Sequence, residues 1–281
     1  MKKTLFLFSI IALAFASCDK IDDPTPNNFV GTEGIIWDDS LYIESSTSMR
    51  KIIIEEFTGQ LCTYCPDGAR EIERLDSIYT NQFIPISIHA GAFADPNNGA
   101  PDDFRTTEGT AYNNTFGASS YPAGTVSRLN NAAVTGNSQW ETDILSIKND
   151  APKVSIGLST LYDDSTRTLK SIVSTEWLSN ETGNYNVQLY LLEDSIVAYQ
   201  LDNSVHIQNY THRHMLRKAI NGTWGTPIPS SNLGDTDTQD FAIELNSAWN
   251  KDHCIVVAHV YKVAPDYEIL QAEELHIIDT H

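Results

Sequence analysis

Two cysteines at positions 62 and 65 are the residues of this sequence best suited to chemistry. Two thiols at this spacing, placed where a strand leads into a helix, are typical of a thiol–disulfide centre. The positive end of the helix dipole and the unpaired N–H groups there favour a thiolate on the first cysteine. We therefore expect Cys62 to attack as a thiolate and Cys65 to resolve the mixed disulfide.

The residues around this pair predict the elements that must position it. The apolar run Ile52–Ile54 predicts a strand before the cysteines, and Pro66 suits the first turn of a helix after them. Apolar residues then recur at helical spacing, at Ala69, Ile72, Leu75 and Tyr79. Cys65 extends the same face of this helix. We therefore expect Cys65 to be buried and Cys62 to lie nearer to solvent.

Beyond the first helix, the sequence pattern changes once. Up to residue 150 it alternates between strands and helices, with an edge strand at Ile35–Tyr42, a strand at Phe83–His89, a helix at Phe104–Phe116, a strand after Pro122 and a helix at Trp140–Asn149. After Ala151-Pro152 the apolar residues alternate as in a β-sandwich. The strands expected there are 154–158, 169–177, 187–192, 241–245, 254–261 and 267–277.

This order of elements resembles that of a thioredoxin-like domain. In that family a proline in the cis form lies against the dithiol, and Pro122 is the matching residue. An ordinary turn proline is the alternative at this position. The family also keeps a buried carboxylate near its dithiol, and the resemblance assigns that place to Glu56, six residues before Cys62. Such a carboxyl group would have a raised pKa and relay a proton to the buried thiol.

The neighbouring Glu55 complicates this assignment. Successive residues of a strand point to opposite faces, so Glu55 and Glu56 cannot both face one interior. The sequence leaves open which of them points toward the dithiol.

Several separated motifs narrow the resemblance further. The stretches EEFTG with CxxCP, IPISIHAGAF, FGASSYPAGTVSR and YTHRHMLR are similar to the twenty-eight-kilodalton outer-membrane-protein family. Its members are lipoproteins of Bacteroidetes-type bacteria. The resemblance implies an α/β thioredoxin-like domain joined to an all-β, immunoglobulin-like sandwich at the outer membrane, facing the periplasm or the cell surface.

The N-terminal residues predict export and a lipid anchor. Lys2 and Lys3 precede an apolar run, Leu5–Phe15, which is too short for an ordinary membrane span. The sequence Phe-Ala-Ser-Cys that ends at Cys18 resembles a bacterial lipobox, although the usual Leu is Phe here. We expect Cys18 to carry lipid, such as palmitate, and so to hold the protein on a membrane. The alternative is ordinary secretion with no role for Cys18.

Charge and cysteine usage limit the partners. The net charge of the chain is −19, which disfavours binding to nucleic acid. In an oxidising compartment Cys62 and Cys65 are expected to rest as a disulfide, and Cys254 to be a buried, inert thiol. No cofactor is expected. His212 and His214 would share one face of a strand, but no further ligand follows at metal-binding spacing, so a polar strand edge is the preferred interpretation.

We therefore divide the chain into a signal peptide at 1–17, a tether at 18–34, a thioredoxin-like domain at 35–150 and a β-sandwich domain at 151–281. The expected function is thiol–disulfide exchange with the thiols or disulfides of exported proteins. The alternative is a non-enzymatic surface lipoprotein that binds through its sandwich, with Cys62–Cys65 a structural disulfide. Enzymatic activity is thus one of two hypotheses.

Overall fold

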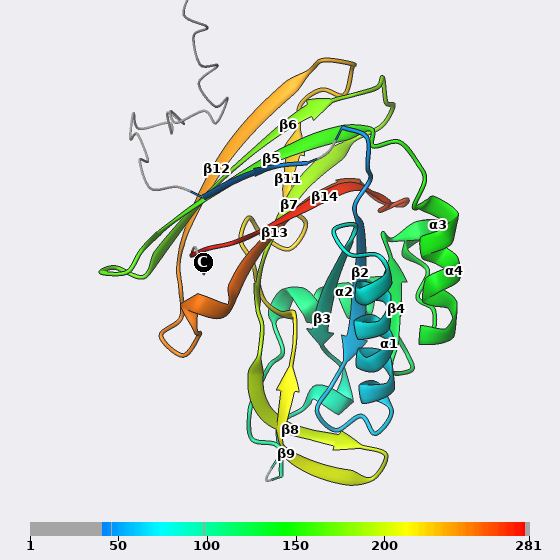
Figure 1. Ribbon diagram of the computed structural model, residues 1–281, viewed down its shortest axis with the longest axis vertical. Coiled ribbons are helices and arrows are strands. Elements are labelled where there is room, and N and C mark those ends of the chain that lie inside the picture. The colour runs from blue at the N-terminus through cyan, green and yellow to red at the C-terminus, as the bar shows by residue number, and fades with distance from the viewer. Residues whose placement is uncertain (1–40, 46, 98, 279–281) are drawn as a thin grey trace, which may run out of the picture.

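The computed structural model describes residues 41–45, 47–97 and 99–278 (Figure 1). Its helices are α1 (Cys65–Ile78), α2 (Thr107–Phe116), α3 (Leu129–Ala132) and α4 (Asn137–Ile147), with 3-10 turns η1 (Ala92–Ala94) and η2 (Lys251–His253). Its strands are β1 (Leu41–Glu44), β2 (Ile52–Thr58), β3 (Phe83–His89), β4 (Ala123–Val126), β5 (Val154–Asp163), β6 (Thr168–Trp177), β7 (Tyr185–Glu193), β8 (Ile196–Asp202), β9 (Val205–His212), β10 (Met215–Ala219), β11 (Thr226–Ile228), β12 (Thr236–Glu244), β13 (Cys254–Lys262) and β14 (Ile269–His276). Every α-helix of the described residues precedes residue 150, as the change of period predicted.

One sheet joins strands from both halves of the chain. Its strand order is β14-β13-β7-β10-β3-β2-β4, and β11 pairs with β7 beside this path. Strand β2 runs parallel to β3 and antiparallel to β4. Strand β3 also pairs in parallel with β10, where Ser87 lies opposite Met215. The division into two domains at residue 150 stays a prediction, and this sheet contains strands from both sides of it.

The eight-stranded sheet is buried on both faces near the cysteines. On one face α1 and α4 pack against β2, with Ile54, Leu75 and Trp140 in one apolar cluster. On the opposite face α2 contributes Tyr112 to a cluster that contains Phe57 of β2. A strand covered on both sides has no solvent-facing positions, so its sequence does not alternate between apolar and polar residues. All residues of β2 are buried for this reason.

A second sheet, with the order β1-β5-β6-β12, packs against the far end of the first (Figure 1). Alternate residues of β5 and β6, such as Ile156 and Val173, share a core with alternate residues of β7 and β13, such as Leu189 and Val256. This is the packing of a β-sandwich. The strand-rich C-terminal half is thus confirmed, and its immunoglobulin-like class stays a prediction.

The first strand differs from the prediction. The edge strand was expected at Ile35–Tyr42 beside the central strand, but β1 spans Leu41–Glu44 and pairs with β5 of the second sheet. Residues 35–40 lie outside the described part of the chain. The pairing partner could not be inferred from sequence, because it is a strand more than a hundred residues away in the chain.

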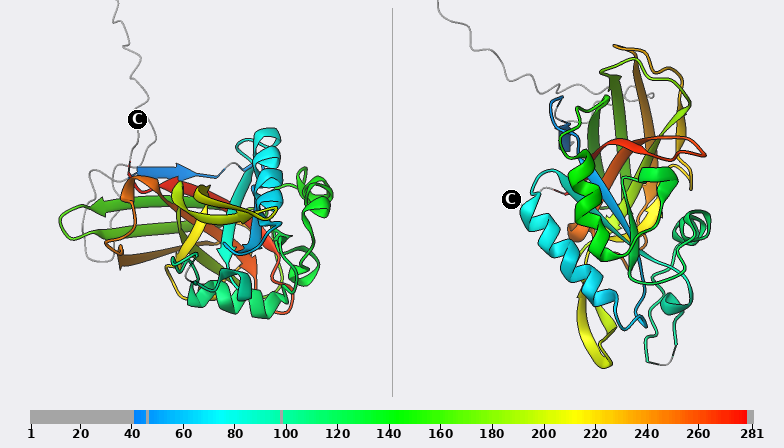
Figure 2. Two further views of the ribbon diagram at one scale, coloured as in Figure 1. Left: turned by 90° about the horizontal axis from the view of Figure 1, so that it is seen from below. Right: turned by 90° about the vertical axis from the view of Figure 1, so that its right-hand side faces the viewer.

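Strands β8 and β9 form a two-stranded hairpin of their own. In Figures 1 and 2 this hairpin extends past the end of the main sheet, on the side away from the second sheet, and reaches the start of α1. Asn203 and Ser204 at its tip both have positive φ, of 46° and 72°, as a tight hairpin turn requires. No strand was predicted between residues 192 and 241, and this hairpin contacts the cysteine turn.

Candidate functional site

The two cysteines lie at the junction that the sequence predicted. Strand β2 ends at Thr58, a turn follows, and α1 begins at Cys65 with Pro66 in its first turn. The two sulfur atoms form a disulfide, with 5.4 Å between the Cα atoms of Cys62 and Cys65. The positive end of the α1 dipole therefore lies beside this pair.

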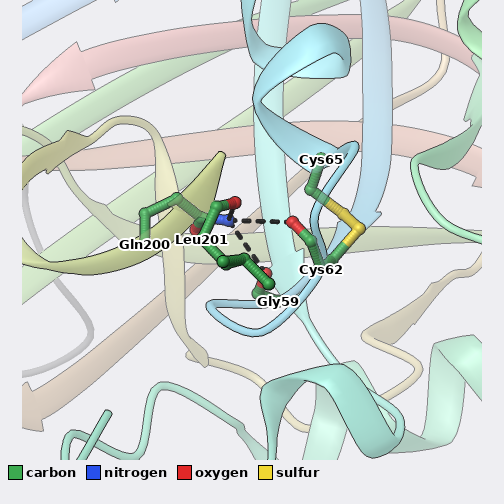
Figure 3. Close-up of a disulfide and its surroundings, with 5 residues drawn as sticks. All are labelled: Gly59, Cys62, Cys65, Gln200 and Leu201. Atoms are coloured by element: carbon green, nitrogen blue, oxygen red, sulfur yellow. Dashed lines mark hydrogen bonds between the residues drawn. A yellow bond between two sulfur atoms is a disulfide. The ribbon is translucent and has the colours of Figure 1, made fainter. Parts of the chain in front are cut away.

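Both cysteines are buried, which corrects the expectation that Cys62 lies nearer to solvent. Each is only 2% exposed. The cause is the β8–β9 hairpin, which packs over the turn (Figure 3). The side-chain amide of Gln200 donates to the backbone oxygens of Gly59 and Cys62, at 3.3 and 3.1 Å. The spacing of apolar residues in the helix predicts which face of that helix is buried. It does not predict that a hairpin near residue 200 covers the turn before the helix.

Pro122 lies against α1 near the disulfide. The Tyr121–Pro122 peptide bond is cis, as the resemblance implied. The close approach depends on Gly68 in α1. A Cβ atom at that position would lie 2.7 Å from Cβ of Pro122 and 2.4 Å from Oε1 of Glu56. Glycine is unfavourable inside a helix, so its presence here reflects packing rather than helix propensity.

The structure decides between the two glutamates. Both are buried, but they point to opposite faces of β2. Glu55 accepts two hydrogen bonds of 2.7 Å from Arg128 and one from the hydroxyl of Tyr190. Glu56 lies on the α1 face instead, beside Pro122, with no hydrogen-bond partner for its Oε1 atom. Glu56 is therefore the carboxyl group on the side of the dithiol.

The environment of Glu56 strongly disfavours its charged form. Burial raises the pKa of Glu56 to about 8, and a hydrogen bond with the Ser87 side chain acts in the opposite direction. Among the described residues no cation is paired with Glu56, in contrast to Glu55. A carboxyl group with this pKa exists in both protonation states close to neutral pH, which suits proton transfer.

A cavity of about 380 Å³ adjoins this group. Its walls include Cys65, Glu56, Ser87, His89 and His212. Burial lowers the pKa of both histidines, that of His212 to about 4 and that of His89 well below its usual value. The imidazoles are therefore neutral at pH 7, while Glu73, Asp76 and Arg213 supply charged groups elsewhere on the cavity wall.

The histidine pair does not have the geometry expected from the sequence. His212 ends β9, but His214 lies in the connection to β10 with φ of 50°, so the two do not share a strand face. His212 packs its ring against His89 and Phe104. Its Nε2 atom lies 3.1 Å from the backbone oxygen of Tyr199. In the described part of the chain no three His, Cys, Asp or Glu side chains cluster as metal ligands would.

Cys254 is buried, as predicted. It is fully inaccessible in β13, and burial raises the pKa of its thiol to about 12. Cys18, the expected lipidation site, lies outside the described residues. Among the residues that the structure describes, no helix is long and apolar enough to cross a membrane.

Sequence reasoning missed three residues of the site. Gln200 comes from a distant hairpin and carried no signal. Gly68 interrupts a helical pattern, and an internal glycine does indicate a close packing contact. Ser87 stands at an alternate position of an apolar strand, which marks it as facing something polar.

The comparisons with known proteins address the fold and the family. Residues 109–275 match the family model for "Outer membrane protein Omp28". HBP35 of Porphyromonas gingivalis is similar in structure, with a TM-score of 0.65 and 18% identity over 83% of this chain and 77% of that one. A protein of Agrobacterium tumefaciens has a TM-score of 0.51 and 13% identity over 83% of this chain and 96% of its own.

A domain of the outer membrane lipoprotein Omp28 from Porphyromonas gingivalis is also similar. It is 26% identical over 45% of this chain and 88% of its own, with a TM-score of 0.33. No curated protein matches the sequence. The family match begins after the two cysteines of the site, at residue 109, so it carries no information about the disulfide.

Proposed function

This chain belongs to the outer membrane protein Omp28 family, and we propose that at the outer membrane it exchanges disulfides with the thiols of exported proteins. One observation carries the proposal. The Cys62–Cys65 disulfide at the start of α1 shares one face of β2 with a cis proline and a carboxyl group whose pKa is about 8. A purely structural disulfide needs none of these neighbours.

The exchange begins when a thiolate of the partner protein attacks the sulfur of Cys62. A bond forms between the two, the Cys62–Cys65 bond breaks, and the sulfur of Cys65 leaves with the electron pair. A second thiolate of the partner then attacks its own sulfur in the mixed disulfide and releases Cys62 as a thiolate. The partner loses two electrons and gains a disulfide, while the cysteine pair is reduced. The same steps in reverse reduce a disulfide of the partner.

Glu56 provides the proton for the first step. Because burial keeps it protonated up to a pH of about 8, it can give its proton to the sulfur of Cys65 as that atom leaves. In the reverse direction the resulting carboxylate takes the proton back from the Cys65 thiol. Both groups line the same cavity, so this transfer needs no route through the protein surface.

The resemblance to a thioredoxin-like domain supports this assignment. The order β2, α1, β3, α2, β4, with β2 between parallel β3 and antiparallel β4, follows the order expected from the sequence. The residues between the cysteines, Thr63 and Tyr64, include no cation that would lower the pKa of Cys62 further. We therefore expect a moderate rather than a strong oxidant.

The test is a trapping experiment on the mature protein. Cys65→Ser removes the resolving thiol, so mixed disulfides between Cys62 and exported proteins should accumulate and be visible on non-reducing gels. The double variant Cys62→Ser/Cys65→Ser is the control and should trap nothing. A reduction potential below about −300 mV, together with no trapped partner, would mark the pair as structural and refute the proposal.

The second candidate is a non-enzymatic surface lipoprotein whose disulfide only stabilises the turn. The burial of both sulfur atoms favours it, because each cysteine is 2% exposed. The trapping experiment separates the two candidates.

Membrane attachment through lipid on Cys18 is part of the proposal. Metabolic labelling with palmitate should mark the wild-type protein but not the Cys18→Ser variant. Secretion of unlabelled wild-type protein would refute the anchor.

A further inference from the structure

The β8–β9 hairpin occupies the surface that any partner of Cys62 would need. Besides the Gln200 contacts, the backbone N–H of Leu201 donates to the oxygen of Gln60 at 2.9 Å (Figure 3 shows the Gln200 contacts). The backbone N–H of Asn203 donates to the oxygen of Thr63, also at 2.9 Å. The hairpin thus donates hydrogen bonds to the carbonyl oxygens of Gly59, Gln60, Cys62 and Thr63, in the turn that contains Cys62.

The pattern of these contacts is that of a bound extended chain. Leu201 lies in β8 and Asn203 follows the last residue of that strand, so their N–H groups have the two-residue spacing of one edge of an extended strand. Any extended polypeptide offers N–H groups at the same spacing, whatever its sequence. The carbonyl oxygens of Gln60 and Thr63 are therefore acceptors that the main chain of any extended segment can use.

The tip of the hairpin is attached to this surface more weakly than its base, where Ala198, Tyr199 and His212 are buried. Its two strands pair only with one another. Val197 and Val205 are each 61% exposed, so these two apolar side chains contribute little to the packing of the hairpin against the rest of the protein. At the tip Arg70 of α1 donates to Asp202 at 3.0 and 3.3 Å in an exposed ion pair, and the backbone N–H of Ser204 donates to the side-chain oxygen of Thr63 at 3.0 Å. Elements with few buried contacts open at low free-energy cost.

We propose that the hairpin is an internal occupant of a polypeptide-binding surface, and that an extended segment of a partner protein displaces it to reach Cys62. This inference rests on the proposed function, and it names the substrate class as unfolded or looped polypeptide. The displaced hairpin exposes Cys62, and the incoming main chain replaces the hydrogen bonds that the hairpin gives up. A small thiol compound cannot replace them and depends on spontaneous opening.

The first test measures how often the hairpin opens. In reduced protein with Cys65→Ser, the rate of Cys62 alkylation by iodoacetamide reports exposure of that thiol. Asp202→Asn removes the ion pair to the hairpin. Asp67→Asn removes the other carboxylate on Arg70, within α1, and is the matched control because it deletes the same charge near Cys62. We expect alkylation of Asp202→Asn to be about fivefold faster than that of Asp67→Asn.

Gln200→Met provides a second variant, which keeps the size of the side chain and removes its amide. We expect about tenfold faster alkylation, because two hydrogen bonds to the turn are lost. Equal rates for Asp202→Asn and Asp67→Asn, with no acceleration by Gln200→Met, would overturn the proposal.

The second test measures binding of polypeptide without any redox chemistry. The probe is a reduced and carboxymethylated protein, which stays unfolded and has no thiol. Wild-type protein should bind it, and Asp202→Asn should bind it more tightly by the same factor that accelerates alkylation, because the open state is more populated. Failure to bind, or equal affinity for both proteins, would overturn the proposal. If both tests succeed while Cys65→Ser traps no partner, the exchange function fails and the binding surface stands.

Discussion

The two faces of strand β2 carry adjacent glutamates in opposite electrostatic situations. Glu55 is paired with Arg128, whose guanidinium group is 1% exposed and also contacts the hydroxyl of Tyr190. Burial is the largest single influence on the pKa of Arg128 and lowers it, but the charge and hydrogen bonds of Glu55, together with Tyr190 and Tyr112, raise that pKa well above its usual value. Glu56, one residue further, is as deeply buried and has no cation, so its pKa rises to about 8.

The two glutamates are neighbours on one strand, so the strand does not explain the difference between them. The protonation state of each carboxyl group depends on the segment that packs against its face of β2. The face that meets Arg128 holds a fixed charge pair, which ties residues of both halves of the chain together. The face that meets α1 holds a group able to gain and lose a proton beside a disulfide. A paired charge suits a structural role and an unpaired acid suits chemistry.

The largest effect is expected from breaking the pair on the structural face. Arg128→Met leaves the charge of Glu55 buried without a partner, so the free energy of unfolding should fall by about 3–5 kcal/mol, measured by urea denaturation at pH 7. The double variant Glu55→Leu/Arg128→Met buries no charge and should recover most of this loss. A single variant as stable as wild type would contradict the role assigned to the pair.

A smaller effect of opposite sign is expected on the other face. The folded state keeps a proton on Glu56 up to a pH of about 8, whereas the unfolded chain releases it near 4.5. Between these values the folded state binds more protons, so the stability contributed by this group is present below 4.5 and is lost as the pH rises toward 8. Glu56→Gln removes this loss, so the free energy of unfolding of the variant relative to wild type should rise by about 3.5 kcal/mol between pH 5 and pH 8.

The measurement compares urea denaturation of wild-type and Glu56→Gln protein at pH 5 and pH 8. The difference between the two proteins isolates Glu56 from other groups that titrate in this range, such as Glu274, whose pKa burial raises to about 7. The same variant should slow disulfide exchange, because it cannot supply the proton to Cys65. An equal pH dependence in both proteins would show that Glu56 is not protonated at neutral pH.

The smallest effect is expected at the contact between α1 and the face of β2 that carries Glu56. Gly68→Ala places a methyl group 2.4 Å from Oε1 of Glu56, so side chain or helix must shift. The gain in helix propensity offsets part of this cost, and we expect a net loss of about 1–2 kcal/mol in thermal or urea unfolding. In a Glu56→Ala background the closer contact is gone, so the penalty should shrink. An unchanged penalty would place the strain at Pro122 instead.

Local elements of the fold were predictable because local sequence determines them. The strand Phe83–His89 was predicted with its observed bounds, since turns flank an apolar run of ordinary strand length. The helix at the cysteines followed from its apolar spacing and Pro66. The β8–β9 hairpin was missed because its strands are half-exposed and their apolar residues follow no clean alternation.

The candidate site was predictable in part. Cys62, Cys65 and Pro122 were found through spacing and resemblance; the structure joins the two cysteines and places Pro122 against Gly68 of the helix that begins at Cys65. The burial of Cys62 was predicted wrongly, because Gln200 reaches it across 138 residues of chain. No local pattern encodes which distant segment will cover a turn.

By itself the sequence determined the chemistry that this protein has available: two cysteines at the start of a helix, a proline at the matching position, and two glutamates on one strand. The order and separation of these residues are set by the covalent chain, so they do not depend on how the chain packs. Only the tertiary structure decided that both faces of β2 are buried, that Arg128 neutralises Glu55 and leaves Glu56 protonated, and that a hairpin closes over Cys62. These outcomes depend on desolvation and on contacts between distant segments, and such energies do not exist until the chain has folded.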